Sequence, residues 1–315
     1  MAETFGLQGS IDAGCESEAA ATAPTQIFEV EGFLKVIQAK HRNRLPLPQP
    51  ASVHIRRSYA ESRFGQVHVW TAYPSGGGFD ERTPLVCLHH GGGSGRFFTP
   101  MLRELGSDRS VYALDLPGHG TSDAPTSKFS IADLAAAVGD FLDGLRLRTV
   151  DVFGYQLGAQ VAAELGIARG QQVRRIMLWG MPGYAAQDRV TVLGTAAARE
   201  DGSDVVEEWK RMLEHRGPGV PMSALADDFS DRLRSGVYGQ RALAASADYP
   251  VAERLPLVRQ QVLVMRPKDE FYETAPRVRS ALPNASLLDL SEFGQGFISA
   301  APQRFAAVSR EFLDR

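Results

Sequence analysis

The stretch that decides the fold is DVFGYQLGAQVAAELG, residues 151–166. Mostly apolar residues lead into a glycine, a tight turn follows, and a run of small residues comes next. This order predicts a buried strand, a sharp turn and a helix. The turn has the frame GYQLG, residues 154–158, with Gln156 at its centre. A glutamine amide cannot attack a carbonyl carbon as an activated hydroxyl does, so the turn raises the question of its purpose.

Similar alternation of strands and helices surrounds this stretch. Short apolar runs separated by helical segments are typical of a mostly parallel sheet covered by helices on both faces. Two β-rich runs flank Arg63-Phe64-Gly65 and predict a hairpin before the parallel part. We expect strands in VHIRRSYAES, QVHVWTAYPS, PLVCLHH, SVYALDLPGHG, TVDVFGY, VRRIMLWGMP, QVLVMRPKDE and ASLLDLSEFG, and helices in IADLAAAVGDFLDGL, 158–168 and PQRFAAVSREFLDR.

Two regions depart from this alternation. Residues 1–50 read as a polar N-terminal extension with one amphipathic helix over 27–41. Residues 183–255 contain three helical stretches, VVEEWKRMLEH, MSALADDFSDRLRSG and GQRALAASADY. The segment is too long for a connecting loop, so it predicts an inserted helical cap. The α/β core is therefore expected over residues 51–182 and 256–315.

Composition excludes several classes of function. The 315-residue chain has a formal net charge of -3 and no block of basic residues, so no nucleic-acid partner is expected. No apolar run reaches the roughly 18 residues of a membrane span. The N-terminus lacks the features of a signal peptide, which favours the cytoplasm. Two cysteines make no disulfide framework. Scattered histidines and glycine-rich loops without a phosphate-binding lysine predict neither a metal site nor another cofactor.

Three motifs, LHHGGGSG (88–95), DLPGHGTSD (115–123) and GYQLG (154–158), together resemble the α/β-hydrolase fold family, over about residues 52–315. LHHGGGSG (88–95) is similar to that family's His-Gly loop, and DLPGHGTSD (115–123) to the loop after its fourth strand. GYQLG lies where the family has its nucleophile elbow. Each motif is common alone, but their order and spacing are specific. The resemblance implies a mostly parallel central sheet of the α/β-hydrolase type with an inserted helical cap.

The resemblance also implies a serine, an acid and a histidine in that chain order. Gln156 stands at the serine position, and Gln295 stands where the histidine is usual. The acid position falls on Asp269 or Glu270, and counting from the strand end slightly favours Glu270. A serine route needs both a hydroxyl and a base, so the standard acyl-enzyme chemistry is not expected here.

An oxyanion site is expected to remain, because it uses backbone N–H groups. The resemblance implies one from Leu157 and another from Gly91 or Gly92. Glycine at those positions lets a ligand approach the backbone closely. Gln156 and Gln295 would then orient a polar substrate, since amides both donate and accept hydrogen bonds.

Five further residues are candidates for the binding pocket. His90 either contacts the ligand or braces its own loop, and Tyr155 offers a phenol beside the elbow. Phe97 and Phe98 follow the glycine-rich loop and are expected to wall the pocket or pack in the core. Ser94 is a candidate for a relocated nucleophile, although no partner base is evident.

Three hypotheses follow. The first is a non-hydrolytic enzyme, of the lyase, isomerase, cyclase or decarboxylase type, that acts on a small carbonyl compound with Glu270 or Asp269 as acid/base. The second is a ligand-binding or interaction protein without catalysis, with the N-terminal extension as an oligomer contact. The third is a hydrolase with a relocated nucleophile or carboxylate-activated water. An introduced inactivating change would explain one glutamine, but two are not expected.

Overall fold

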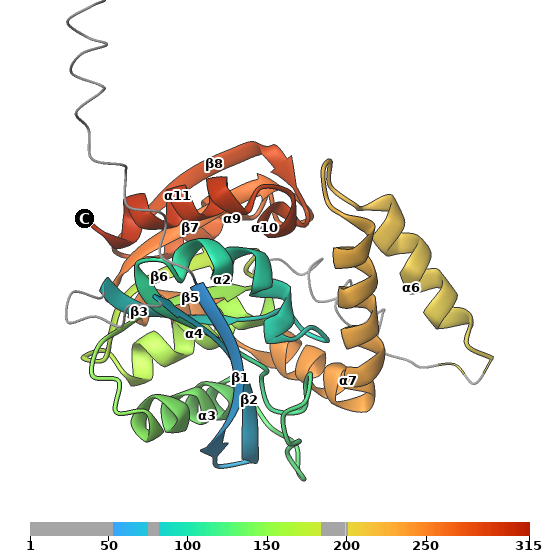
Figure 1. Ribbon diagram of the computed structural model, residues 1–315, viewed down its shortest axis with the longest axis horizontal. Helices are drawn as coiled ribbons and strands as arrows, with labels where there is room; N and C mark the ends of the chain where they lie inside the picture. Colours follow the sequence, from blue (N-terminus) through green and yellow to red (C-terminus); the bar gives the residue numbers. More distant parts are fainter. Residues whose placement is uncertain (1–52, 75–81, 184–198, 200) are drawn as a thin grey trace, which may run out of the picture. The chain divides into compact units, whose positions relative to one another are not determined.

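A computed structural model describes residues 53–74, 82–183, 199 and 201–315. The predicted helix over 27–41 and the rest of the N-terminal extension lie outside these residues. The described strands form one eight-stranded sheet in the order β1-β2-β4-β3-β5-β6-β7-β8 (Figure 1). The sheet comprises β1 Val53–Ser62, β2 Gly65–Pro74, β3 Arg82–Leu88, β4 Arg109–Leu114, β5 Val150–Tyr155, β6 Val173–Trp179, β7 Gln261–Lys268 and β8 Ala285–Gly294.

Pairing within the sheet follows the sequence pattern. β1 and β2 form the predicted antiparallel hairpin, with Ser62 opposite Gly65, and β2 pairs antiparallel with β4. The remaining pairs are parallel. This confirms the α/β class and the mostly parallel sheet of the α/β-hydrolase type.

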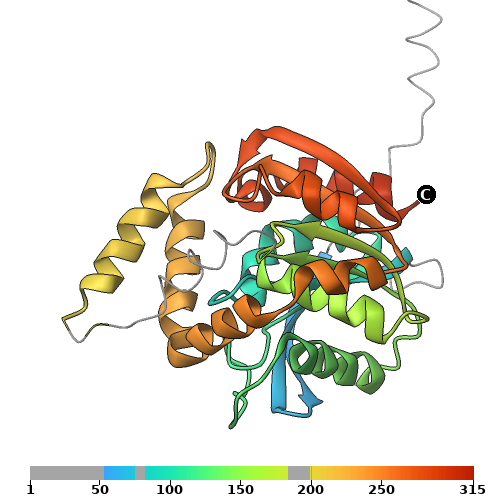
Figure 2. The same cartoon turned by 180° about the vertical axis from the view of Figure 1, so that it is seen from behind.

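Helices lie on both faces of the sheet, as Figures 1 and 2 show from opposite sides. Some short ones, such as α2 and α9, were not predicted, because a seven-residue helix carries little periodic signal. The helical elements are η1 Gly95–Phe98, α2 Thr99–Leu105, α3 Ile131–Gly144, α4 Leu157–Ala168, α6 Ser203–Glu214, α7 Met222–Asp248, α8 Val251–Arg254, η2 Leu255–Leu257, α9 Ala275–Ala281, α10 Phe297–Ala300 and α11 Pro302–Leu313.

Alternating side chains of the strands supply two separate cores. In β3, Val86 and Leu88 pack with α3 and α4, while Leu85 and Cys87 pack with α2 and α11. All four side chains are fully buried. Burial on both faces explains why this strand is apolar at successive positions, as expected for a parallel sheet.

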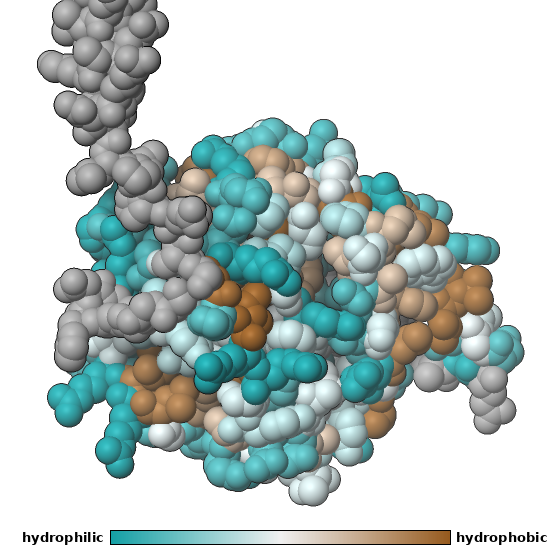
Figure 3. Space-filling model, viewed as in Figure 1, coloured by the Kyte–Doolittle hydropathy of each residue, from teal (hydrophilic) through white to brown (hydrophobic). Residues whose placement is uncertain are grey.

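The helix pair α6–α7 falls within the predicted insertion. α7 is kinked at Gly236, whose φ of 48° and ψ of -129° interrupt the helix between two of the predicted helical stretches. The outer side of α6 exposes Val206 and Leu213, and apolar side chains gather there at the right of Figure 3. None of the described helices is long and apolar enough to cross a bilayer.

Candidate functional site

The turn after β5 has the backbone of a nucleophile elbow. Gln156 adopts φ 50° and ψ -114°, a region that side-chain-bearing residues rarely occupy. Its N–H donates to the carbonyl of Trp179 at 2.8 Å, which ties the turn to β6. The flanking glycines are required, because a Cβ on Gly154 would lie 2.2 Å from the Gly158 carbonyl oxygen, and one on Gly158 would lie 2.0 Å from that of Leu88. The close strand–helix contact therefore holds Gln156 in a strained conformation.

The Gln156 side chain links two other groups. Its Nε2 donates to Glu270 Oε1 at 2.8 Å and to the Tyr155 hydroxyl oxygen at 3.2 Å. A carboxylate accepts hydrogen bonds, so the amide nitrogen must face Glu270, and this fixes the orientation of the amide. Neither the amide oxygen nor the Tyr155 O–H hydrogen has a hydrogen-bond partner among the described residues.

Tyr155 is held between other aromatic rings. It stacks on Phe97 with ring centroids 5.2 Å apart and an interplanar angle of 10°, and its centroid lies 4.6 Å from that of Trp179. Burial, followed by the nearby carboxylates of Asp269 and Glu270, raises the pKa of the phenol well above its usual range. Tyr155 is therefore a neutral hydrogen-bond donor at physiological pH.

The two acid candidates after β7 have different partners. Asp269 accepts hydrogen bonds from Trp179 Nε1 at 2.6 Å and from the Phe271 N–H at 2.9 Å. Burial raises the pKa of the Asp269 carboxyl to about 6, against the opposing effect of these hydrogen bonds. Glu270 is exposed and is the residue that reaches Gln156.

Gln295 follows β8 and lies near the loop after α6. Its carbonyl oxygen accepts the Gly217 N–H at 3.2 Å, and a Cβ on Gly217 would lie 2.4 Å from that oxygen. The side-chain amide has no hydrogen-bond partner among the described residues. It is thus available to a ligand.

A cavity of about 570 Å³ lies between α2, α10 and the helix pair α6–α7. Tyr155, Gln295, His90 and Phe97 all line it, so the fold brings together four of the predicted site residues. Gln156, Glu270 and Leu157 do not line it, and Gln156 is linked to it through Tyr155. Phe98 does not line it either. It is fully buried against Phe153, because successive side chains of the short helix η1 point in different directions.

The His-Gly loop lies against the start of α4, where a Cβ on Gly158 would be 2.8 Å from the His89 carbonyl oxygen. Gly91 and Gly92 line a second cavity of about 470 Å³ beside α6–α7. Neither donates its N–H to a described residue. With Leu157 at the first turn of α4, these glycines remain candidates for oxyanion donors on the elbow side.

The two histidines of the loop brace it. Burial lowers the pKa of the His89 imidazole to about 3, and its neutral ring joins the His90 carbonyl to the Leu116 N–H at 2.7 and 2.9 Å. His90 has Nδ1 at 3.0 Å from the Gly91 carbonyl oxygen and Nε2 at 2.8 Å from Asp228 Oδ1. Nδ1 of His90 is therefore hydrogen-bonded, whereas Nε2 contacts Asp228 without a hydrogen bond of good geometry, and the ring connects the loop to α7.

Asp228 is held in turn by its own helix neighbour. Arg232 Nε lies 3.1 Å from its second oxygen, at i,i+4 spacing on α7. Burial favours the neutral acid, but His90 and Arg232 outweigh burial and keep the pKa of Asp228 below its usual range. The ion pairs fix this wall of the cavity.

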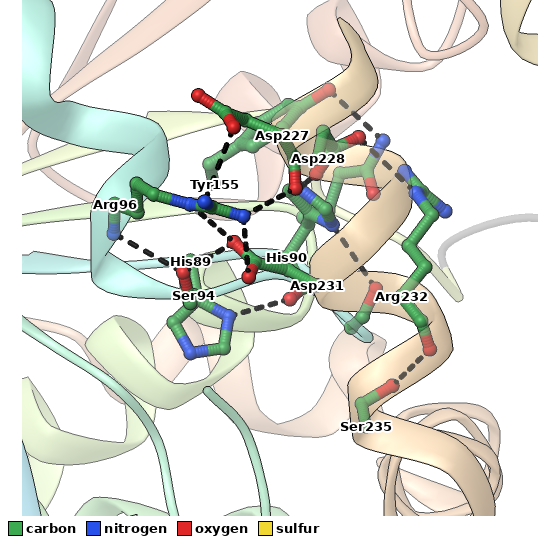
Figure 4. Close-up of polar contacts among 12 residues, drawn as sticks. His89, His90, Ser94, Arg96, Tyr155, Asp227, Asp228, Asp231, Arg232 and Ser235 are labelled. Carbon is green, nitrogen blue, oxygen red and sulfur yellow. Dashed lines mark hydrogen bonds and ion pairs between the residues drawn. The ribbon is translucent and has the colours of Figure 1, made fainter. Parts of the chain in front are cut away.

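Ser94 and Arg96 make a second connection to α7 (Figure 4). Ser94 Oγ donates to Asp231 Oδ2 at 2.6 Å, and accepts the Arg96 N–H at 3.2 Å. Arg96 also pairs with Asp231 at 2.8 Å and with Asp227 at 3.1 Å. Ser94 is buried and lines neither cavity, so its hydroxyl caps η1 and anchors α7.

Sequence reasoning missed the partners on α7. Asp228, Asp231 and Arg232 were not singled out, and Asp231 is 137 residues from its partner Ser94. The only signal was the density of charge in ADDFSDR. Among the described residues, no group of three histidine, cysteine or carboxylate side chains has the arrangement of a metal site.

Comparison with known proteins agrees with this architecture. A family model described as the alpha/beta hydrolase fold matches residues 83–222. The acetyltransferase component of the acetoin cleaving system of Cupriavidus necator is 31% identical over 100 residues, covering 32% of this chain and 27% of that protein. RutD of Pseudomonas savastanoi, which is named provisionally as a carbamate hydrolase, is 24% identical to this chain over 244 residues. The match covers 73% of this chain and 94% of RutD. The chain spans only 27% to 34% of the length of the first curated relatives it matches.

Solved structures give the same result. An enol-lactonase from Burkholderia xenovorans LB400 superposes with a TM-score of 0.70 at 16% identity, covering 82% of this chain and all of that one. An esterase from Rhodococcus sp. ECU1013 superposes with a TM-score of 0.68 at 22% identity, covering 82% of this chain and 98% of the esterase. Strand order, elbow geometry and these similarities together show that the chain has the α/β-hydrolase fold.

Proposed function

We propose that this protein is a non-hydrolytic enzyme that acts on a small carbonyl-containing organic molecule. One observation carries the proposal: a hydrogen-bond chain runs from Glu270 through Gln156 to Tyr155, and ends at a neutral phenol that lines a cavity. The cavity volume of about 570 Å³ lies within the roughly 300–1,000 Å³ typical of small-molecule sites.

The chain of hydrogen bonds favours donation by Tyr155. Its oxygen accepts from Gln156, so its own proton is left for a substrate oxygen. Accepting one hydrogen bond strengthens the donor at the other side of the hydroxyl. A buried, preorganised donor stabilises negative charge that develops on a carbonyl oxygen. An enolate-like state would be stabilised in this way during lyase, isomerase, cyclase or decarboxylase chemistry.

Hydrolysis by a relocated serine has less support. The Ser94 proton is directed at Asp231, and the side chain lines neither cavity. Gln156 cannot form an acyl-enzyme. A serine adduct after treatment with a fluorophosphonate, seen by intact-mass spectrometry and mapped to a peptide, would overturn this conclusion.

A ligand-binding protein without turnover is the second candidate, and a specific observation favours it. Asp228 and Asp231, which line the cavity, are ion-paired with Arg232 and Arg96, and His90 Nδ1 lies 3.0 Å from the Gly91 carbonyl oxygen. All three groups are thus held by partners within the protein. Tight binding of carbonyl compounds without any chemical change would support this candidate over the first.

The test is proton exchange next to a carbonyl. The protein is incubated in D₂O with a series of ketones and 1,3-dicarbonyls that includes 4-oxo-4-phenylbutanoate, and exchange of the α-protons is followed by NMR. We expect exchange above the protein-free rate, and a loss of about 100-fold in Tyr155→Phe, the typical effect of removing one oxyanion donor. Tyr59→Phe, at a 54% exposed position on β1, is the matched control. Exchange that is absent throughout the series, or unchanged in Tyr155→Phe, contradicts the proposal.

A further inference from the structure

We infer that the ligand of the 570 Å³ cavity is a small organic carboxylate, held by Arg103 and Arg216 at its rim. This inference names the substrate class of the proposed function and rests on that function for the reacting end of the molecule.

The carboxylates of α7 that line the cavity are paired. Asp227 and Asp231 share Arg96, at 3.1 and 2.8 Å. Asp228 lies between His90 and Arg232, at 2.8 and 3.1 Å. Each of these three acids therefore already has a cationic partner within the protein.

Glu104, the remaining acid of the lining, has a neutral partner. Its Oε1 accepts the side-chain amide of Gln303 at 2.9 Å. Arg96 and Arg232 are used by the α7 carboxylates, so two guanidinium groups of the lining remain. Neither Arg103 nor Arg216 has an ion pair or a hydrogen bond to an acid among the described residues.

The guanidinium groups of Arg103 and Arg216 come from different parts of the fold. Arg103 lies on α2, beside the sheet, and Arg216 lies in the loop between α6 and α7. Both side chains are exposed, and both line the same cavity. A guanidinium presents a planar set of N–H donors that matches the two oxygens of a carboxylate. A ligand with a neutral amide has only one oxygen to accept from these donors and carries no charge.

The rest of the lining fits such a ligand. Trp70, Phe97, Val220 and Leu225 provide apolar surface, and Tyr155 provides the donor for a carbonyl oxygen. A molecule with a carboxylate at one end, an apolar body and a carbonyl at the other would satisfy all three features. Because an exposed ion pair is weak, the carboxylate contributes selectivity more than tight binding.

The experiment compares acids with their neutral twins. Dissociation constants are measured by calorimetry for 4-oxo-4-phenylbutanoate, for 4-oxopentanoate and for the primary amide of each, at low and high salt. We expect each acid to bind about 10-fold more tightly than its amide at low salt, the effect expected of a partly exposed charge-assisted contact. High salt should reduce this preference, because salt screens exposed charges.

Variants assign the preference to the two arginines. Arg103→Gln and Arg216→Gln should each weaken acid binding several-fold, and the double variant should bind acid and amide equally. Arg279→Gln, an exposed arginine on α9 outside the cavity, is the matched control and should change nothing. Equal binding of acid and amide by the unmodified protein, a preference that survives in the double variant, or failure of both acids to bind overturns the inference.

These outcomes are separable from failure of the proposed function. The preference is an equilibrium measurement, so it needs no turnover and should persist in Tyr155→Phe. Loss of the acid preference with intact proton exchange rejects only the carboxylate. Retained preference without exchange rejects only the chemistry.

Discussion

The elbow at Gln156 and the contact between the His-Gly loop and α7 lie at the same end of the sheet, but they are organised by different forces. At the elbow, glycines on both sides of a tight turn impose a strained backbone on Gln156. At the contact with α7, charged side chains decide the arrangement through the pairs His90–Asp228 and Arg96–Asp231. The fold thus supplies a position, whereas the side chains supply its chemistry.

The largest expected effect on stability concerns Asp269, beside the elbow. Its pKa is about 6 in the folded protein and near 4 when unfolded, so the folded state binds the proton more tightly. Protonation of Asp269 therefore adds about 3 kcal/mol to the free energy of unfolding below about pH 4. This contribution is lost as the pH rises through 6. Urea unfolding of the unmodified protein and Asp269→Asn should show that their difference in free energy of unfolding falls across this window. A difference that stays flat or rises would show that burial does not govern this carboxyl.

A second change breaks the contact with α7 and leaves the elbow intact. Asp231→Ala should cost about 2 kcal/mol, less than the 3–5 kcal/mol of a fully buried pair, because Arg96 is one-third exposed and keeps Asp227. Thermal and urea unfolding measure the cost. Asp227→Ala, whose side chain is 57% exposed, is the control and should have little effect. Equal losses in the two variants would mean that burial of Asp231 is unimportant.

The smallest expected effect concerns backbone strain. Gln156→Gly should raise the free energy of unfolding by about 1 kcal/mol, because glycine relieves a strained φ while losing some entropy on folding. Arg146, with φ 55°, is the other described non-glycine residue at positive φ. Arg146→Gly should stabilise similarly without changing proton exchange, whereas Gln156→Gly should lower exchange. If Gln156→Gly keeps full exchange, the Gln156 amide does not polarise the Tyr155 phenol.

The sequence predicted the parts of the molecule that local pattern controls. The strands, the hairpin, the elbow and the helix break near Gly236 all follow from apolar periodicity and glycine placement. Counting from the end of β7 favoured Glu270, which is the acid that contacts Gln156. The roles assigned to these side chains stay predictions.

Other features depend on contacts between distant segments and left no periodic signal. The Ser94–Asp231 hydrogen bond joins residues 137 positions apart, and the amphipathic pattern of α7 does not show which acid faces the loop. Phe97 and Phe98 were treated alike, but only Phe97 lines the cavity, because the direction of each ring depends on η1. The phenol of Tyr155 was noted without its direction, which only the packing against Phe97 and Trp179 determines.

The most direct test of the account is a double-mutant cycle between Tyr155 and Gln156, measured as α-proton exchange. Tyr155→Phe should lower exchange about 100-fold and Gln156→Leu about 10-fold, since the amide acts by polarising the phenol. The double variant should then be no slower than Tyr155→Phe alone, because the amide has lost the group through which it acts. A double variant slowed by the product of the two single effects, about 1,000-fold, would show that the residues act independently and would contradict the hydrogen-bond chain as the source of catalysis.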